Sequence, residues 1–144
     1  MPGKLIVGYD GSPAARRAVD FAAAAARAQD ASLVIAHVLE WSPYSFLTKE
    51  EIEERHARRR DELRRAEDAV IAPVRERLAS TGLKVETMIA YGHSAEKLCA
   101  LAGETGATQI VVGRDGNGGL ASRMFGSTAG SLVQIAPLPC TIVP

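Results

Sequence analysis

Five residues in the C-terminal third of the chain have the types and spacing of a phosphate-binding segment. A short β-branched run ends at Gly113, two residues separate it from Gly116, and nine more precede Gly126. Glycines let the main chain turn sharply and approach a ligand. Ser127 and Thr128 follow at once, where a helical pattern begins, and the N-terminus of a helix favours negative charge. The segment predicts a nucleotide loop; the alternative is an ordinary strand–turn–helix connection with Ser127 as the helix cap.

A carboxylate ends the first strand-like run of the chain. The run Lys4–Asp10 is followed by a turn that opens a helix. In parallel sheets, ligands bind beyond the carboxyl ends of the strands, where the strand order reverses. If the first and fourth strands are neighbours at that reversal, we expect Asp10 to lie on the same crevice as Gly113. The alternative is an Asx turn, in which the Asp10 carboxylate bonds only the adjacent backbone.

Several better-known sites are absent from the sequence. No Gly-x-x-x-x-Gly-Lys-Ser/Thr occurs and no Gly-x-Gly-x-x-Gly follows the first strand, which excludes P-loop and dinucleotide motifs. Asp10 has no acidic neighbour and a Tyr-Gly pair ends the third strand, which argues against a phospho-acceptor receiver domain. The spacing of His37, His56 and His93 fits neither a metal site nor a nucleophile–base pair. We expect His37 in the core and His93 either at the crevice rim or packed where a helix begins.

Short apolar runs alternate with helical patterns along the whole chain. This alternation predicts an α/β fold with one doubly wound parallel sheet in a single domain, residues 1–144. The third strand alternates in polarity and is expected at an edge of the sheet. The long helix before it loses its apolar stripe around His56–Arg60, so that part should stand out from the body, and Pro73 should kink or split it. The expected strands are Lys4–Asp10, Ser32–Glu40, Lys84–Tyr91, Gln109–Gly113 and Cys140–Val143, and the expected helices are Pro13–Ala28, Thr48–Ser80, Ala95–Thr105 and Ser127–Ala136.

The composition limits the classes of partner that the protein is expected to bind. Lys+Arg and Asp+Glu number 17 each, so no net field recruits nucleic acid or an anionic membrane. No apolar stretch approaches the roughly 20 residues that span a bilayer, and the N-terminus shows no signal-peptide pattern, so we expect a cytoplasmic protein. Cys99 and Cys140 stand in apolar surroundings and are expected to be packed, unreactive thiols.

The glycine segment and several other segments together resemble the ATP-binding branch of the universal stress protein family. The family's hallmark, G-2x-G-9x-G-(S/T), is intact here as G-R-D-G-N-G-G-L-A-S-R-M-F-G-S. Four further segments match the family in the same order along the chain: V-G-Y-D-G-S at the first strand, H-V-L at the second, G-H-S-A-E-K-L, and the closing A-P-L-P-C-T-I-V-P. The resemblance covers the whole chain. It implies five strands in the order 3-2-1-4-5, four helices on both faces, and a fold similar to the adenine nucleotide alpha hydrolases that binds ATP without being a dedicated enzyme.

Carried over by position, the resemblance also implies an ATP site and a homodimer. Asp10 would lie near the ribose and phosphates with a possible indirect Mg²⁺ contact, and Val38 would offer backbone groups to adenine. Family members commonly dimerise through the last strand, here Cys140–Val143. The implied nucleotide-binding residues are Asp10, Gly11, Val38, Gly113, Arg114, Gly116, Gly126, Ser127 and Thr128.

One position departs from the family pattern. Arg114-Asp115 stands where the family often has a small or basic pair such as Ser-Arg or Thr-His. An Asp115 carboxylate that faced phosphate would oppose nucleotide binding by repulsion between like charges. A carboxylate that pointed to solvent, or that paired with Arg114 or Arg123, would not oppose it. Arg123 in turn is either a phosphate contact or a solvated surface arginine.

These observations predict an ATP-binding regulatory or stress-response module whose nucleotide occupancy is read by partner proteins. Any hydrolysis should be slow, because the sequence offers no placed general base or arginine finger. Two alternatives stay open: a dimeric interaction module with a vestigial loop, and an adenylate-forming or nucleotidyl-transfer enzyme, although His-x-Gly-His and a lysine-rich loop are absent. A bulky residue at Gly113 or Gly126 is expected to abolish ATP binding and leave the fold intact.

Overall fold

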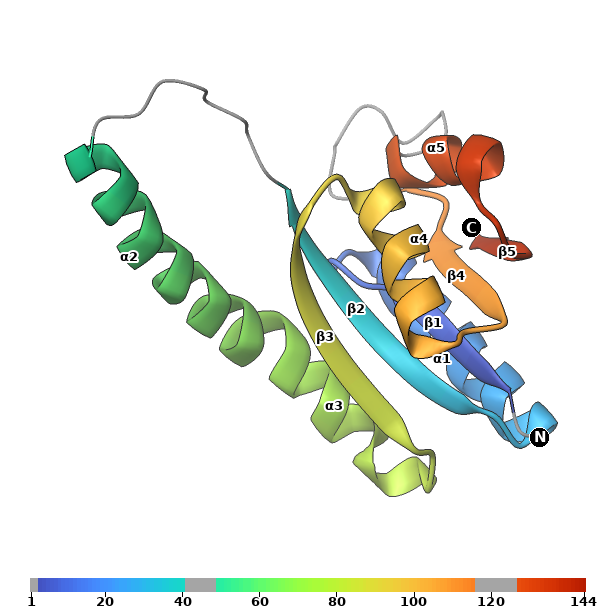
Figure 1. Ribbon diagram of the computed structural model, residues 1–144. Coiled ribbons are helices and arrows are strands. Elements are labelled where there is room, and N and C mark those ends of the chain that lie inside the picture. Colours follow the sequence, from blue (N-terminus) through green and yellow to red (C-terminus); the bar gives the residue numbers. More distant parts are fainter. Residues whose placement is uncertain (1–2, 41–48, 116–126) are drawn as a thin grey trace.

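The structure, a computed structural model, describes residues 3–40, 49–115 and 127–144. Its strands are all parallel and form one sheet in the order β3-β2-β1-β4-β5 (Figure 1). This confirms the expected sheet and its order, with the third and fifth strands at the edges. The strands are β1 (Lys4–Gly8), β2 (Ser32–Glu40), β3 (Val85–Gly92), β4 (Gln109–Gly113) and β5 (Cys140–Val143).

Helices cover both faces of the sheet, so its central strands are buried on both sides. Along β1, Leu5 and Val7 pack against α1 and α3, whereas Ile6 between them packs against α4 and α5. Successive side chains of a strand point to opposite faces, which is why these strands read as continuous apolar runs. The helices are α1 (Pro13–Gln29), α2 (Lys49–Ala66), α3 (Ala72–Leu78), α4 (Ser94–Thr105) and α5 (Ser127–Ile135).

The long segment predicted as one helix is continuous through Pro73 because a wider turn precedes the proline. Residues 67–71 form a π-helical turn, in which the N–H of Ala72 bonds the carbonyl of Glu67. Proline has no N–H to donate and disrupts a regular helix, and π turns accommodate such breaks. Ile71 and Val74 are buried against the sheet, so the segment is held at the place where its hydrogen bonding changes.

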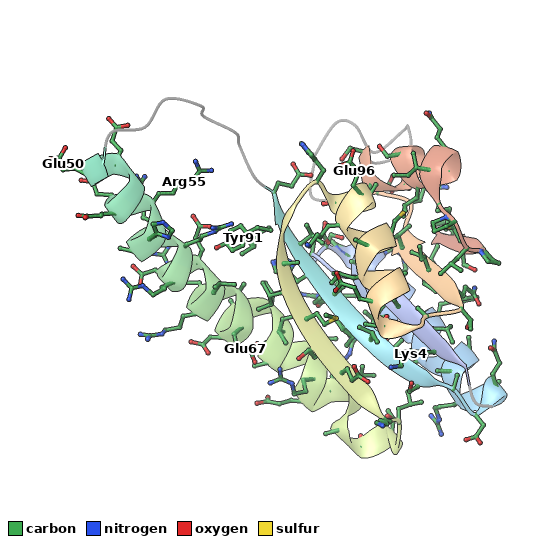
Figure 2. All side chains as sticks on the ribbon, viewed as in Figure 1. Lys4, Glu50, Arg55, Glu67, Tyr91 and Glu96 are labelled. Carbon is green, nitrogen blue, oxygen red and sulfur yellow. The ribbon has the colours of Figure 1, made fainter. Side chains whose placement is uncertain are left out.

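The first turns of α2 stand away from the body (Figures 1 and 2), whereas the part predicted to stand out, around His56–Arg60, contacts the sheet at Arg59. Tyr91 of β3 reaches across to this helix. Its hydroxyl lies 3.1 Å from the Arg59 carbonyl and 3.2 Å from Glu62 Oε2, and the Arg59 guanidinium lies 4.4 Å from the centre of its ring. Burial, and then the Glu62 carboxylate, raise the pKa of Tyr91, which keeps its hydroxyl proton available for these acceptors.

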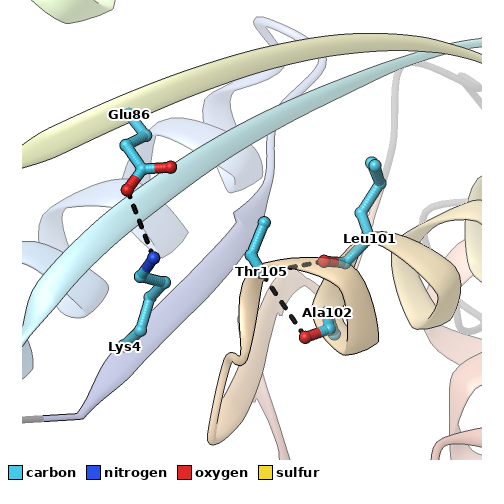
Figure 3. Close-up of polar contacts among 5 residues, drawn as sticks. All are labelled: Lys4, Glu86, Leu101, Ala102 and Thr105. Carbon is cyan, nitrogen blue, oxygen red and sulfur yellow. Dashed lines mark hydrogen bonds and ion pairs between the residues drawn. The ribbon is translucent and has the colours of Figure 1, made fainter.

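Two polar contacts secure the amino end of the sheet and the end of α4 (Figure 3). Lys4 Nζ lies 3.2 Å from Glu86 Oε1 and joins β1 to β3 across β2. Thr105 donates its hydroxyl to the Leu101 carbonyl at 2.8 Å, and Gly106 then ends the helix in the left-handed conformation. None of the helices in the described ranges is long and apolar enough to cross a membrane.

Candidate nucleotide site

The backbone turns away from the sheet sooner after β1 than the sequence predicted. β1 ends at Gly8, although Tyr9 N–H still bonds the Ala36 carbonyl at 2.9 Å. The carboxylate of Asp10 accepts the N–H of Ser12 at 2.9 Å, which is the bond of the Asx-turn alternative. Gly11 has φ of +80°, and a Cβ there would meet none of the described residues within 4 Å. A ligand role for Asp10 and Gly11 stays a prediction.

Ser12 fixes the start of α1 beside this turn. Its buried hydroxyl accepts the N–H of Ala15 at 3.1 Å, and Pro13 occupies the first helical turn. We expect Ser12→Ala to lower the free energy of unfolding by about 1 kcal/mol, because the helix loses its cap. Urea unfolding monitored by circular dichroism measures this, with Ser12→Gly, expected to cost only a few tenths of a kcal/mol, as the control. Equal unfolding midpoints for Ser12→Ala and the unmodified chain would contradict the capping role.

His37 holds the end of β1 in place from the neighbouring strand. Its ring is buried, and Nδ1 lies 2.7 Å from the Tyr9 carbonyl oxygen. Because a carbonyl only accepts, Nδ1 carries the hydrogen in this bond. The expectation that His37 is a satisfied core residue is confirmed.

Gly113 at the end of β4 packs against the first turn of α1. A Cβ on Gly113 would lie 2.8 Å from the carbonyl carbon of Ala14 and 2.9 Å from its Cβ. The register pairs Val7 with Val111, so β1 and β4 leave the sheet at the same edge, as predicted. The expectation that a bulky residue at Gly113 leaves the fold intact is wrong, because this glycine is required by packing between β4 and α1.

Arg114 and Asp115 follow at the same edge. The Arg114 N–H bonds the carbonyl of Val143 at 2.7 Å, and its Nε lies 3.9 Å from Asp115 Oδ1. Of the alternatives for Asp115, pairing with Arg114 is present, while Arg123 lies outside the described residues. Oδ1 of Asp115 is nevertheless buried, without a hydrogen-bond partner among the residues that the structure describes. The carboxylate is thus held at the edge of the candidate site rather than turned fully to water.

Ser127 and Thr128 are the first residues of α5 and open onto a hollow of about 480 Å³. The N-terminus of α4 borders the same hollow, so two helix starts converge on it. Backbone N–H groups at both starts favour an anionic ligand. The lining residues are Glu40, His93, Ser94, Ala95, Glu96, Ser127, Thr128, Ser131, Gln134 and Ile135.

Most of these lining residues escaped sequence reasoning, which had named only His93, Ser127 and Thr128 among them as site candidates. Glu40 ends β2, and Ser94 and Glu96 begin α4; the Ser94 hydroxyl donates to Glu40 Oε1 at 3.3 Å. The rule that directed attention to Asp10, namely that sites gather at the carboxyl ends of strands, applies equally to Glu40. The exposed His93 precedes α4 and lines this hollow; its place at the rim of the Asp10–Gly113 crevice stays a prediction.

The remaining predicted residues are divided between the core, the edge and the segments outside the described ranges. Val38 is half-buried in β2 and packs against the cluster beneath α4. Asp10, Gly11 and Gly113 do not line the hollow that Ser127 and Thr128 form. Gly116, Arg123 and Gly126 lie outside the described residues. Within the described ranges, no three His, Cys, Asp or Glu residues are placed to hold a metal ion.

Both cysteines are packed thiols, as expected. Cys99 and Cys140 lie half-buried against the cluster beneath α4 and α5. Burial raises the pKa of each thiol, and the proximity of Cys99 raises that of Cys140 further. The reactive thiolate form is disfavoured in both.

The sequence and the fold match those of known proteins along the whole chain. A sequence model of the universal stress protein family matches residues 1–144. The universal stress protein YxiE of Bacillus subtilis is 30% identical over 156 residues, covering 99% of each chain. The structure of universal stress protein UspA from Lactobacillus plantarum superposes with a TM-score of 0.85 at 24% identity, covering 99% of this chain and 97% of that one. A universal stress protein in complex with cAMP has a TM-score of 0.63 at 29% identity, covering 99% and 96%. This chain belongs to the universal stress protein family.

Proposed function

We propose that this protein binds an adenine nucleotide, ATP, at the carboxyl edge of its sheet and acts as a regulatory stress-response module. The observation that carries the proposal is the start of α5 at Ser127, directly after the glycine spacing, with Ser127 and Thr128 open to the hollow. A helix N-terminus with hydroxyl side chains is suited to phosphate. The complex of a related universal stress protein with cAMP supports an adenine nucleotide as the ligand class.

The described residues fit such a ligand at several points. Gly11 leaves open space that a Cβ would fill, and the carboxylate of Asp10 lies beside it, where it would contact Mg²⁺ through water if ATP arrives with the metal. Ser127 and Thr128 would hold phosphate oxygens. The backbone of Val38 would meet adenine, and the exposed Arg114 side chain would lie near the phosphates.

Regulation rather than turnover is the proposed role. Among the described residues that line the hollow there is no Arg or Lys to stabilise the charge of a transferring phosphoryl group, so hydrolysis would be slow at most. Partner proteins would read nucleotide occupancy. Strand β5 is the last strand of the described sheet, and its four residues are half-buried; pairing there with a second copy would give a homodimer.

The experiment is to identify the nucleotide that the purified protein carries. Heating releases the bound ligand, and chromatography is expected to show ATP or another adenine nucleotide. Adding ATP at about 100 times its Kd to stripped protein should stabilise it by roughly 2.7 kcal/mol and raise the Tm by roughly 5–10 °C. A blank chromatogram followed by no ATP-induced shift would instead favour the interaction module with a vestigial loop.

Asp115→Ser should strengthen nucleotide binding. Removing one negative charge near the phosphates lowers repulsion by about 1 kcal/mol, roughly a fivefold gain in affinity, and the gain should shrink as salt rises. Calorimetric titration with ATP measures it, with Glu104→Ser on the exposed surface of α4 as the matched loss of charge. Unchanged affinity in Asp115→Ser would show that the carboxylate does not face phosphate.

A further inference from the structure

The outward surface of α2 is a long exposed face that no described part of the chain covers. Between Glu50 and Arg65, the residues whose burial is described are exposed except for the half-buried Arg55 and Leu63. The helix meets the body through its other side, where Tyr91 contacts Arg59 and where Ala66 is buried. Figures 1 and 2 show the first turns of α2 projecting beyond the sheet.

A regular stripe runs along this outward surface. It consists of Glu50, Glu53, Ala57, Arg60 and Arg64, at alternating steps of three and four residues, and we call it the outer stripe. Ala57 precedes the buried Ala66 by nine residues, which is two and a half turns at 3.6 residues per turn, so it lies on the opposite side of the helix. Alternating steps of three and four residues keep these five positions on one side of the helix, where a second helix packed along it would meet them.

The order of charges along the outer stripe is acid, acid, small, base, base. In an isolated helix this order is unfavourable locally, because Arg60 and Arg64 are like charges one turn apart. The neighbouring face shows the favourable alternative: Glu54 and Arg58 are four residues apart and form an ion pair at 3.9 Å. Within the described ranges, the four charged residues of the outer stripe form no ion pair of this kind.

We propose that the outer stripe is an interaction surface for a second copy of this chain, paired antiparallel about a two-fold axis at Ala57. Such pairing sets Glu50 opposite Arg64 and Glu53 opposite Arg60 of the second copy, and repeats both pairs by symmetry. The small Ala57 lets the helices approach where they cross. A parallel pairing would set each charge opposite its like, so electrostatics selects the antiparallel arrangement.

Charge complementarity also favours a second copy over other occupants. Nucleic acid would be attracted by Arg60 and Arg64 but repelled by Glu50 and Glu53 on the same stripe, and an acidic or basic peptide would match only half of it. Exposed ion pairs are individually weak and are screened by salt. The association is therefore weak, dependent on concentration and reduced at high salt, and it is separate from the β5 pairing proposed above.

Cysteine cross-linking tests the pairing in the full chain. In a Cys99→Ser, Cys140→Ser background, Ala57→Cys is oxidised with copper phenanthroline, and the disulfide dimer is expected to form at least five times faster than from Glu104→Cys, an exposed position on α4. Glu50→Cys should cross-link no faster than that control, because antiparallel helices hold the two Glu50 positions roughly 21 Å apart along the axis. A β5-mediated dimer alone would give none of this selectivity.

Charge exchange provides the second arm. One variant, Glu50→Arg with Glu53→Arg, makes the charged positions of the outer stripe all basic. The other, Arg60→Glu with Arg64→Glu, makes them all acidic. When each variant also carries Ala57→Cys, it should lose rapid cross-linking, because like charges then face each other. Mixing the two should restore it as a heterodimer, and far-UV circular dichroism checks that both are folded. The proposal is overturned if Ala57→Cys reacts no faster than Glu104→Cys, if Glu50→Cys reacts as fast as Ala57→Cys, or if mixing restores nothing.

Discussion

Gly113→Ala is expected to lower the free energy of unfolding by about 1–3 kcal/mol and to weaken nucleotide binding together with stability. The new Cβ would lie 2.8 Å from the carbonyl carbon of Ala14 and 3.0 Å from its oxygen. Both atoms belong to the backbone of α1, so neither can rotate away as a side chain would. Relief requires β4 and α1 to separate at the edge where the nucleotide is proposed to bind. Urea unfolding and an ATP titration measure the two effects.

Gly103 provides the matched control for Gly113. It lies within α4, and a Cβ there would meet no atom of the described ranges within 4 Å. Alanine is preferred to glycine inside a helix by roughly 0.5–1 kcal/mol, so Gly103→Ala should stabilise the protein. If Gly113→Ala also left the unfolding midpoint unchanged or raised it, the close contact with Ala14 would not constrain the fold.

Ser127→Glu should abolish ATP binding while leaving the protein at least as stable. A carboxylate in the first turn of α5 interacts favourably with the helix dipole, by about 0.3–1 kcal/mol. The same carboxylate occupies the place proposed for phosphate and repels it, and the hydroxyl is lost. Thermal melts with and without ATP separate the two effects: the Tm without ligand is kept and the ATP-induced shift disappears.

Ser80→Glu serves as the control for Ser127→Glu. Ser80 is exposed in the short 3₁₀ turn, residues 79–81, that follows α3. The change of charge is the same, but the position is remote from α5, so the ATP-induced shift should persist. An undiminished shift in Ser127→Glu would place the phosphates elsewhere.

Local patterns predicted most of the fold because its strands are buried on both faces. The continuous apolar run around Ile6 follows from packing on both sides of β1, and the half-buried pattern of β3 follows from its edge position. The sequence predicted correctly that Pro73 disturbs the long helix, but not that the disturbance is a π-helical turn. The π turn before it depends on how Ile71 packs against the sheet, which a local pattern does not encode.

The strand-end rule predicted Asp10 and Gly113 at the carboxyl edge of the sheet, and the start of a helix predicted Ser127. Asp10 and Gly113 do not line the hollow beside Ser127, so one shared nucleotide site stays a prediction. The approach of Gly113 to Ala14 joins residues far apart in the sequence, so spacing alone assigned that glycine to the ligand. Ser94 and Glu40 meet for the same reason, because they lie 54 residues apart in the sequence and only the fold brings them together.

Amide chemical shifts of the ¹⁵N-labelled protein during titration with ATP test the central claim most directly, because they report binding and its location together. The account predicts saturable changes at the N–H groups of Gly11, Ser127 and Thr128, with the exposed residues of α2 unaffected. No change at any amide, or changes confined to residues away from the carboxyl edge of β1 and β4, would contradict it.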